Sequence, residues 1–184
     1  LNNLSEFNFS SISVNKNIWK RHLILKINER EEALLYLEAE KYYFLDNAAN
    51  VITSNDACTA STTENCLKID DNFRKENLLP IIENHSDMAR ISEDQKYAKI
   101  DEEYLNFSFK LYNDLNDSSE FGFKKINLDG EYNTIKVQLN NNLELYFSLK
   151  NDYNEQISKF FTLSRERASD LSGKKYIDLR YGDK

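Results

Sequence analysis

Apolar and polar residues alternate along several short stretches near the start of the chain, which is the pattern of β-strands with one buried face. Residues 9–15 alternate in this way, with Ile12 and Val14 expected to point inward, and a second alternating run follows at residues 22–28. Only a short polar link separates the two runs. The pattern therefore predicts a β-hairpin.

Two further strands are predicted at residues 33–37 and 41–46. The stretch 31–40 is also rich in Glu, Ala and Leu, which favour a helix, but the strand interpretation is preferred here. Residues 78–82 form another short apolar stretch. Because Pro80 cannot donate a backbone hydrogen bond, this stretch is expected at the edge of a sheet or in a turn.

The stretch 53–65 is rich in Ser, Thr and Asn and is expected to form an exposed loop. The chain has two cysteines, Cys58 and Cys66, and both lie at this loop. Two cysteines alone do not complete a zinc site, and the two histidines lie elsewhere in the sequence. A local disulfide formed in an oxidising compartment is one interpretation, and two unrelated free thiols are the other.

From about residue 91 the apolar spacing changes to that of a helix. One helical face collects Ile100, Tyr104, Leu111 and Leu115, assisted by Tyr97, Ser108 and Tyr112. Alternation then returns at residues 126–128, 135–139 and 143–149, with turn residues between them. These three runs predict an antiparallel meander with one apolar face.

A second helix is predicted after the meander, because Asp152 and Glu155 stand in capping-box register. Gly173 is expected to terminate it. Its apolar stripe contains Tyr153, Ile157, Phe160, Phe161, Ser164 and Ala168. The whole pattern predicts an α+β fold, in which two or three helices pack on an antiparallel or mixed sheet and a hairpin precedes it.

The last alternating run, residues 174–183, predicts one short strand. Its two expected faces carry Tyr176, Asp178 and Arg180 on one side and Ile177, Leu179 and Tyr181 on the other. Nothing in this sequence is left to fold beside it except Lys184. The strand is therefore expected at the edge of the sheet, where another chain could pair with it; an ordinary strand with a solvated face is the alternative.

The composition excludes several classes of protein. The chain has 184 residues, 40% of them hydrophobic, a net charge of −7 and no basic block, which argues for a folded domain without a nucleic-acid interface or a polybasic membrane patch. No apolar run reaches the length of a membrane span, and no signal-peptide pattern is present. Because Leu1 is not a start methionine, the sequence is expected to be an excised portion of a longer protein.

Candidate catalytic groups are few. His22 and His85 are interpreted as surface or structural residues, since His22 falls in a predicted strand and His85 in a polar loop after Ile82. The acidic clusters are interpreted as solvated faces, and the four glycines are scattered rather than gathered in a phosphate-binding loop. These residues therefore give no support for an enzyme activity, and we expect no cofactor, no metal and no small-molecule substrate.

Several motifs together resemble the extracytoplasmic part of the bacterial cell-division proteins FtsQ and DivIB. The run 176–181, Tyr-Ile-Asp-Leu-Arg-Tyr, is similar to the closing strand of that family. The segments 19–33, 43–51 and 79–81 are similar to its Trp-Pro and Glu-Arg segment, its Leu-x-Asp-x-x-Gly turn and its Leu-Pro pair. The sequence departs from these motifs at Lys20, Glu32 and Ala49, where the family has Pro, Pro and Gly.

The resemblance implies that residues 1–28 are the end of a POTRA module and residues 29–184 a β-domain. It also implies a non-enzymatic scaffold of septum formation, located outside the cytoplasm and anchored by an N-terminal membrane helix absent from this sequence. Its implied partners are the coiled-coil proteins FtsB and FtsL, bound by strand addition. The residues expected to contact them are Tyr176, Asp178, Arg180, Tyr181 and Arg165.

Two other functions fit parts of the sequence. A POTRA-like module that binds polypeptides during export or outer-membrane assembly would recognise varied unfolded β-peptides rather than one helical partner. A secreted wall hydrolase would need carboxylates or a histidine that converge in a cleft.

Overall fold

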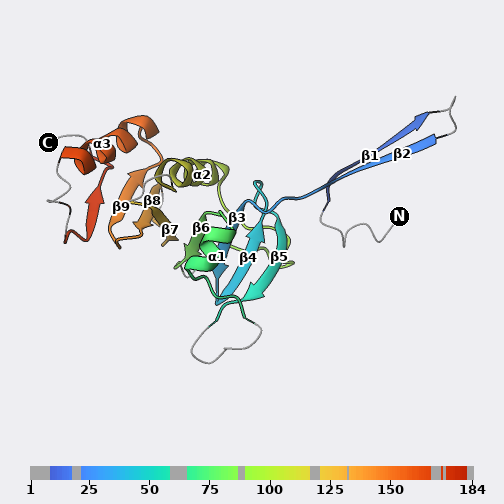
Figure 1. Ribbon diagram of the computed structural model, residues 1–184, viewed down its shortest axis with the longest axis horizontal. Helices are drawn as coiled ribbons and strands as arrows, with labels where there is room; N and C mark the ends of the chain where they lie inside the picture. The colour runs from blue at the N-terminus through green and yellow to red at the C-terminus, as the bar shows by residue number, and fades with distance from the viewer. Residues whose placement is uncertain are drawn as a thin grey trace.

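The computed structural model describes residues 9–17, 22–58, 66–86, 90–116, 121–131, 133–166, 171 and 173–181. These residues form an α+β fold, as the sequence predicts (Figure 1). The strands are β1 (Phe9–Asn17), β2 (His22–Glu29), β3 (Leu34–Glu38), β4 (Lys41–Leu45), β5 (Val51–Asp56), β6 (Ile81–Asn84), β7 (Phe123–Leu128), β8 (Thr134–Leu139), β9 (Glu144–Ser148) and β10 (Tyr176–Asp178). The helices are α1 (Asp71–Glu76), α2 (Glu102–Asn116) and α3 (Tyr153–Glu166).

Eight of the strands form one mixed sheet in the order β10-β9-β8-β7-β6-β3-β4-β5. The meanders β3-β4-β5 and β7-β8-β9 are antiparallel, whereas β3 with β6, β6 with β7, and β9 with β10 are parallel pairs. Adjacent parallel strands need a crossover, which includes α2 between β6 and β7 and α3 between β9 and β10. This topology places β10 at one edge of the sheet and β5 at the other.

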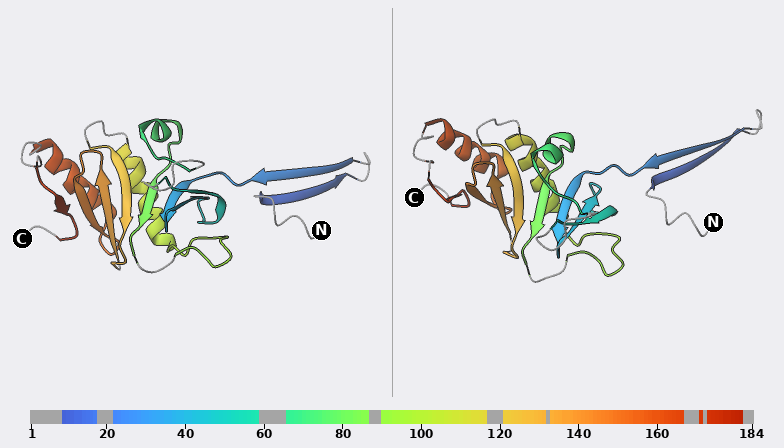
Figure 2. Two further views of the ribbon diagram at one scale, coloured as in Figure 1. Left: turned by 90° about the horizontal axis from the view of Figure 1, so that it is seen from below. Right: turned by 60° about the horizontal axis from the view of Figure 1, so that its bottom comes forward.

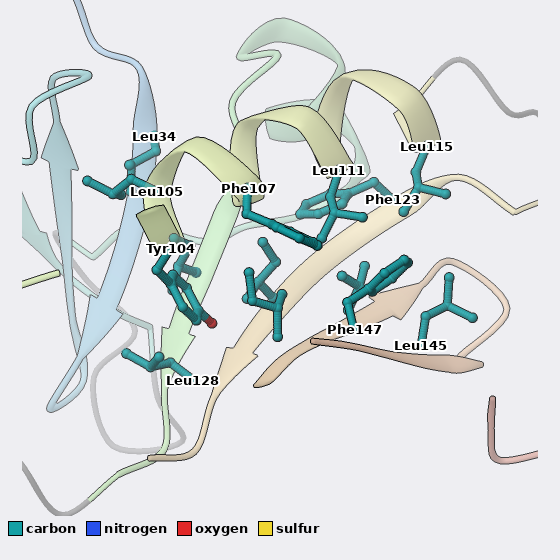
Figure 3. Packing of buried hydrophobic residues seen from close by; sticks show 14 of the residues in the cluster. Leu34, Tyr104, Leu105, Phe107, Leu111, Leu115, Phe123, Leu128, Leu145 and Phe147 are labelled. Carbon is teal, nitrogen blue, oxygen red and sulfur yellow. The ribbon is translucent and has the colours of Figure 1, made fainter. Parts of the chain in front are cut away.

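The larger hydrophobic core lies between the sheet and helices α2 and α3. Figure 3 shows Phe107 and Leu111 of α2 over the sheet, close to Phe147 of β9. A smaller core lies on the opposite face, where Phe73 of α1 packs against Phe44 of β4 with ring centroids 6.4 Å apart. Neither core includes the side chains that β8, β9 and β10 direct to this second face. The residues on this part of the second face are Lys136, Glu144, Tyr146, Tyr176 and Asp178.

The predicted hairpin is confirmed, because β1 and β2 pair antiparallel in a sheet of their own that extends away from the rest of the molecule (Figures 1 and 2). The expected inward orientation of Ile12 and Val14 is wrong, since these side chains are 40% and 58% exposed. The strand pairing does gather apolar residues on one face, with Ile12 opposite Ile27 and Val14 opposite Leu25. All eight residues of β2 are nevertheless exposed, so the hairpin contributes nothing to the two cores.

The strand interpretation of residues 33–37 is confirmed by β3, whose residues Leu34, Leu35 and Tyr36 are all buried. Two expectations nearby are wrong. The loop expected from residue 53 begins later, because β5 continues to Asp56. Pro80 does not restrict β6 to an edge: Pro80 precedes the strand, and its carbonyl accepts a hydrogen bond from the Leu35 N–H at 2.9 Å, so β6 lies inside the sheet.

The helix expected from about residue 91 begins only at Glu102, after a cap in which the Asp101 carboxylate accepts a hydrogen bond from the Glu103 N–H at 2.8 Å. Tyr97 is therefore not part of its buried face and is 45% exposed. The predicted cap of α3 is confirmed, since the Asp152 carboxylate accepts a hydrogen bond from the Glu155 N–H at 2.9 Å.

The predicted meander is also confirmed by β7, β8 and β9. Its turns contain Gly130 and Asn142, with φ angles of 87° and 65°. Ala168 of the predicted helical stripe lies outside the described residues. Gly173 has a φ of 81° in a turn, whereas the described part of α3 ends at Glu166.

Candidate partner-binding edge

The outer side of β10 is the feature that the sequence singled out. Hydrogen bonds at both ends of the pairing join β10 to β9, from the Glu144 N–H to the Lys175 carbonyl at 3.0 Å and from the Leu179 N–H to the Tyr146 carbonyl at 2.9 Å. Backbone groups of alternate residues point to opposite sides of a strand. The N–H and C=O groups of Tyr176 and Asp178 therefore point away from the sheet, and no strand in the described part of the chain pairs with them.

This edge is shorter than the sequence predicts, because β10 covers only Tyr176–Asp178, whereas the predicted strand covers residues 174–183. After that point, the backbone N–H and carbonyl groups of Arg180 form hydrogen bonds with side chains of this chain. The Arg180 N–H donates to Asp178 Oδ1 at 3.1 Å, and Asn151 Nδ2 donates to the Arg180 carbonyl at 2.6 Å. Only two residues of β10 thus offer outward backbone groups for strand addition.

The guanidinium of Arg180 is already paired within the chain. Its Nε donates to Asp178 Oδ1 at 2.9 Å and its Nη2 to Asp178 Oδ2 at 2.7 Å, which is a bidentate, charge-assisted contact. Nη1 donates to Thr134 Oγ1 at 3.2 Å and lies 3.5 Å from the Glu131 carboxylate. The Arg180 side chain is 24% exposed, so a partner would meet a neutralised ion pair rather than an isolated cation.

Aromatic rings surround this ion pair. Tyr176 stacks on Tyr146 of β9 with ring centroids 5.2 Å apart, and the Arg180 guanidinium lies 5.6 Å from the Tyr146 ring and 5.5 Å from that of Tyr181. Tyr176 is 56% and Tyr181 69% exposed. The expectation that Arg180 and Tyr181 lie on opposite faces is wrong, because strand alternation stops at Asp178.

Tyr146 was not among the residues predicted for this site. Its place on the polar side of β9 follows from alternation, but its contact with Tyr176 depends on the parallel pairing of β9 with β10. We call Tyr146, Tyr176, Arg180 and Tyr181, with Asp178, the edge cluster.

Other predicted residues lie outside the edge cluster. Ile177 and Leu179 belong to the larger core, as their alternation predicts, and Leu179 is 3% exposed. Arg165 is exposed in the last turn of α3, and no described contact joins it to the edge cluster. Cys58 and Cys66 form a disulfide after β5, near the opposite edge of the sheet.

The residues considered for catalysis do not converge. His22 is exposed on β2, whereas His85 Nε2 lies 3.3 Å from Asn127 Oδ1 and 3.4 Å from the Glu83 carboxylate. Glu83 itself pairs with Lys125 at 2.6 Å. Over the described ranges, no group of three or more His, Cys, Asp or Glu side chains is placed to hold a metal ion. None of the described helices is long and apolar enough to cross a membrane.

Comparison with known proteins gives no match, either to models of protein families or among curated proteins.

The ion pair of the edge cluster makes a testable prediction about acidity. The hydrogen bonds from Arg180 lower the pKa of the Asp178 carboxyl group, because they stabilise its charged form. In an Arg180→Gln variant we expect this pKa to rise toward the ordinary range for aspartate, as measured by NMR titration of the side-chain carboxyl carbon.

Asp129 provides the control for that titration. Burial raises its pKa, but the hydrogen bonds from Lys136 and the Glu131 N–H, together with the positive charge of Lys136, outweigh this effect and leave the pKa lowered. Arg180→Gln should leave the titration of Asp129 unchanged. An Asp178 pKa that also stays in place would contradict the assignment of its partner.

Proposed function

We propose that this protein is a non-enzymatic scaffold that binds a second polypeptide at the edge formed by β10, and that its partner is a coiled-coil protein of bacterial cell division. The observation that carries the proposal is the edge cluster. It combines two exposed tyrosines and a positioned arginine with a strand whose outward backbone groups pair with no other described strand. Exposed aromatic residues and arginine are the residue types that most often anchor protein interfaces.

Two observations support the resemblance to FtsQ and DivIB. The order α2-β7-β8-β9-α3-β10 agrees with the order of elements in that family. Ala49 stands where the family motif has glycine, and its φ of 61° is a left-handed conformation that favours glycine. The turn is held by Asp46, whose carboxylate accepts hydrogen bonds from the N–H groups of Ala48 and Asn50 at 2.9 and 2.8 Å.

The edge cluster would bind its partner mainly through side chains. Strand addition on two residues supplies few backbone hydrogen bonds, so we expect Tyr176 and Tyr181 to contribute most of the affinity. The ion pair of Arg180 with Asp178 would hold these rings in place. The Arg180 guanidinium would then donate a hydrogen bond to a partner carboxylate in place of its contact with Glu131.

The test uses the membrane-proximal coiled-coil proteins encoded in the same genome. We expect Tyr176→Ala and Tyr181→Ala each to weaken binding by about 10- to 100-fold, since truncating an interface anchor costs on the order of 2 kcal/mol. The melting temperature should hardly change, because both rings are largely exposed. Isothermal titration calorimetry and thermal unfolding provide the two measurements.

Tyr97→Ala is the matched control, because Tyr97 is a 45% exposed tyrosine that pairs with Asn50, close to the β5 end of the sheet. It should leave the affinity unchanged. If Tyr176→Ala and Tyr181→Ala bind as tightly as the unmodified protein, the edge cluster is not the binding site. Equal binding of unrelated extended peptides would favour a polypeptide-binding export module instead.

A proline variant tests strand addition itself. The Tyr176 N–H points away from β9, so Tyr176→Pro removes an outward donor without breaking a bond inside the sheet. We expect Tyr176→Pro to bind the partner more weakly than Tyr176→Ala. Equal affinities would show that the outward backbone of β10 takes no part.

The proposal includes a location outside the cytoplasm and a division of the chain into a POTRA end (residues 1–28) and a β-domain (residues 29–184). The Cys58–Cys66 disulfide supports an oxidising compartment, since cytoplasmic thiols are normally kept reduced. The separate β1–β2 sheet supports a boundary between the hairpin and the eight-stranded sheet.

A further inference from the structure

A cavity of about 630 Å³ lies at the end of the eight-stranded sheet where β6 and β7 begin. Figure 2 shows α1 and α2 close together at this end of the sheet, and both helices contribute to the cavity wall. The wall includes the apolar or aromatic side chains of Leu79, Tyr112 and Phe123 and the polar side chains of Arg74, Lys124 and Asn140. A volume of this size is within the range of small-molecule sites.

The charges of this wall are positive, although the chain as a whole has a net charge of −7. Among the described residues that line the cavity, Arg74 and Lys124 are the only charged ones. A second cavity, at the start of α2, differs in this respect, because the carboxylates of Asp101, Glu103 and Glu131 are part of its wall. The C-terminal end of α2 adds only about half a negative charge to the first cavity. An anion is therefore the kind of ligand that the charges of the first cavity favour.

Arg74 has hydrogen-bond donors available for such an anion. Its Nη1 donates to the Lys124 carbonyl at 2.6 Å, which fixes the guanidinium at the wall. In the described part of the chain, no carboxylate forms an ion pair with Arg74, and its Nε and Nη2 donate to no other residue. The buried side-chain atoms without a partner are Arg90 Nε and Tyr104 Oη, so Nε and Nη2 of Arg74 are accessible to solvent. These two nitrogen atoms can donate side by side to one oxyanion.

The remainder of the wall combines further donors with an apolar surface. Lys124 Nζ donates to Asn142 Oδ1 at 2.8 Å and has two more hydrogens to donate. Burial raises the pKa of Tyr112, so its hydroxyl stays protonated, and its ring meets Phe123 edge to face with centroids 5.2 Å apart. Leu78, which also lines the cavity, is 67% exposed. Apolar surface thus lies beside positively charged donors.

We propose that this cavity binds a small organic anion, in which a carboxylate or phosphate group is joined to a flat apolar body. Nε and Nη2 of Arg74 would donate two parallel hydrogen bonds to the anionic group, and Lys124 would add positive charge. The apolar body would pack against Leu78, Leu79 and the ring of Tyr112. The edge cluster shares no residue with this wall, so the ligand site is independent of the proposed partner binding.

The test is an NMR titration of the full ¹⁵N-labelled chain with phenyl phosphate, phenylacetate and the uncharged phenylacetamide. We expect at least one of the two anions to bind with a dissociation constant in the millimolar range and to shift the amide signals of Arg74, Leu79 and Lys124. Phenylacetamide should bind at least about tenfold more weakly than the tighter anion, because it has no charge to pair with Arg74. The tighter of the two anions identifies the ligand as a phosphate or a carboxylate.

Four variants separate a ligand site from a structural role. Arg74→Gln should weaken binding of the tighter anion at least about tenfold, and Arg74→Lys should recover part of this loss, because it restores the charge without the parallel donors. Lys124→Gln keeps the hydrogen bond from Arg74, whose acceptor is the Lys124 carbonyl, so we expect binding about threefold weaker and an unchanged melting temperature. Lys150→Gln is the matched control, because it removes an exposed cation outside this wall and should leave the affinity unchanged.

Three results would each overturn the proposal: no shift of these amide signals with either anion, equal binding of phenylacetamide, or full affinity in Arg74→Gln. None of them would bear on the edge cluster, whose test uses a polypeptide partner.

Discussion

Replacing Phe147 with alanine should lower the free energy of unfolding by about 3–5 kcal/mol, which is the usual cost of truncating a fully buried aromatic residue. Phe147 is 0% exposed near the end of β9 and directs its ring toward α2 (Figure 3). The ring meets Phe107 edge to face with centroids 6.0 Å apart, and Phe107 in turn meets Tyr153 of α3 at 5.0 Å. Loss of Phe147 therefore leaves a cavity where both helices join the sheet.

Urea unfolding followed by circular dichroism measures this effect, and the melting temperature should fall by roughly 10 °C. Phe161→Ala is the matched control, because Phe161 is only partly buried on α3. It should cost much less than Phe147→Ala. Equal costs for the two variants would mean that α2 and α3 do not depend on this contact with β9.

Replacing Glu38 with alanine should lower the free energy of unfolding by about 2–4 kcal/mol, because a charged acceptor is removed while its donors remain partly buried. The Glu38 carboxylate accepts hydrogen bonds from Tyr36 Oη at 2.7 Å, Asn84 Nδ2 at 2.9 Å and the N–H groups of Arg90 and Ile91 at 2.9 and 3.3 Å. It thereby fastens the segment containing Arg90 and Ile91 to β3. We expect amide exchange of Arg90 and Ile91 to accelerate in Glu38→Ala.

The loss of stability in Glu38→Ala should depend on pH. Burial raises the pKa of Glu38, but the hydrogen bonds from Tyr36, Arg90, Asn84 and Ile91 outweigh it, so the pKa in the folded state is lowered. The stabilisation is thus fully present above the ordinary glutamate pKa and is lost as the pH falls through the lowered value. The difference between Glu38→Ala and the unmodified chain should shrink below about pH 4.

Glu32→Ala is the control for this pH dependence, since Glu32 is exposed just before β3. It should change stability by less than about 0.5 kcal/mol. If Glu38→Ala lost the same amount of stability at every pH, the charge of the Glu38 carboxylate would not be responsible for the stabilisation.

Strands could be predicted from the sequence where one face is buried and the other is polar. Residues 135–139 and 143–149 satisfy this condition, and β8 and β9 follow it closely. The apolar spacing of residues 91–101 is misleading, because Ile91, Ala98 and Ile100 pack in the larger core from an irregular segment. This segment forms one β-bridge within itself and another to Asn50. Periodicity does not reveal where the backbone leaves the helix; the cap at Asp101 decides that.

The candidate site was predictable in its location and not in its geometry. Alternation identifies Tyr176 and Asp178 as neighbours on one face. The parallel pairing of β10 with β9 brings Tyr146 to Tyr176, and the turn after Asp178 brings Tyr181 beside Arg180.

The sequence by itself determined the local elements: the hairpin, the meander, the capped helix α3 and the short final strand, because propensity, alternation and capping act over a few residues. Only the tertiary structure decided the strand order, the inner position of β6 and the pairing of Asp178 with Arg180. These depend on contacts between segments far apart in the chain or on the point where a strand ends. Their free energies come from burial and hydrogen bonding in the assembled sheet, which the local pattern does not contain.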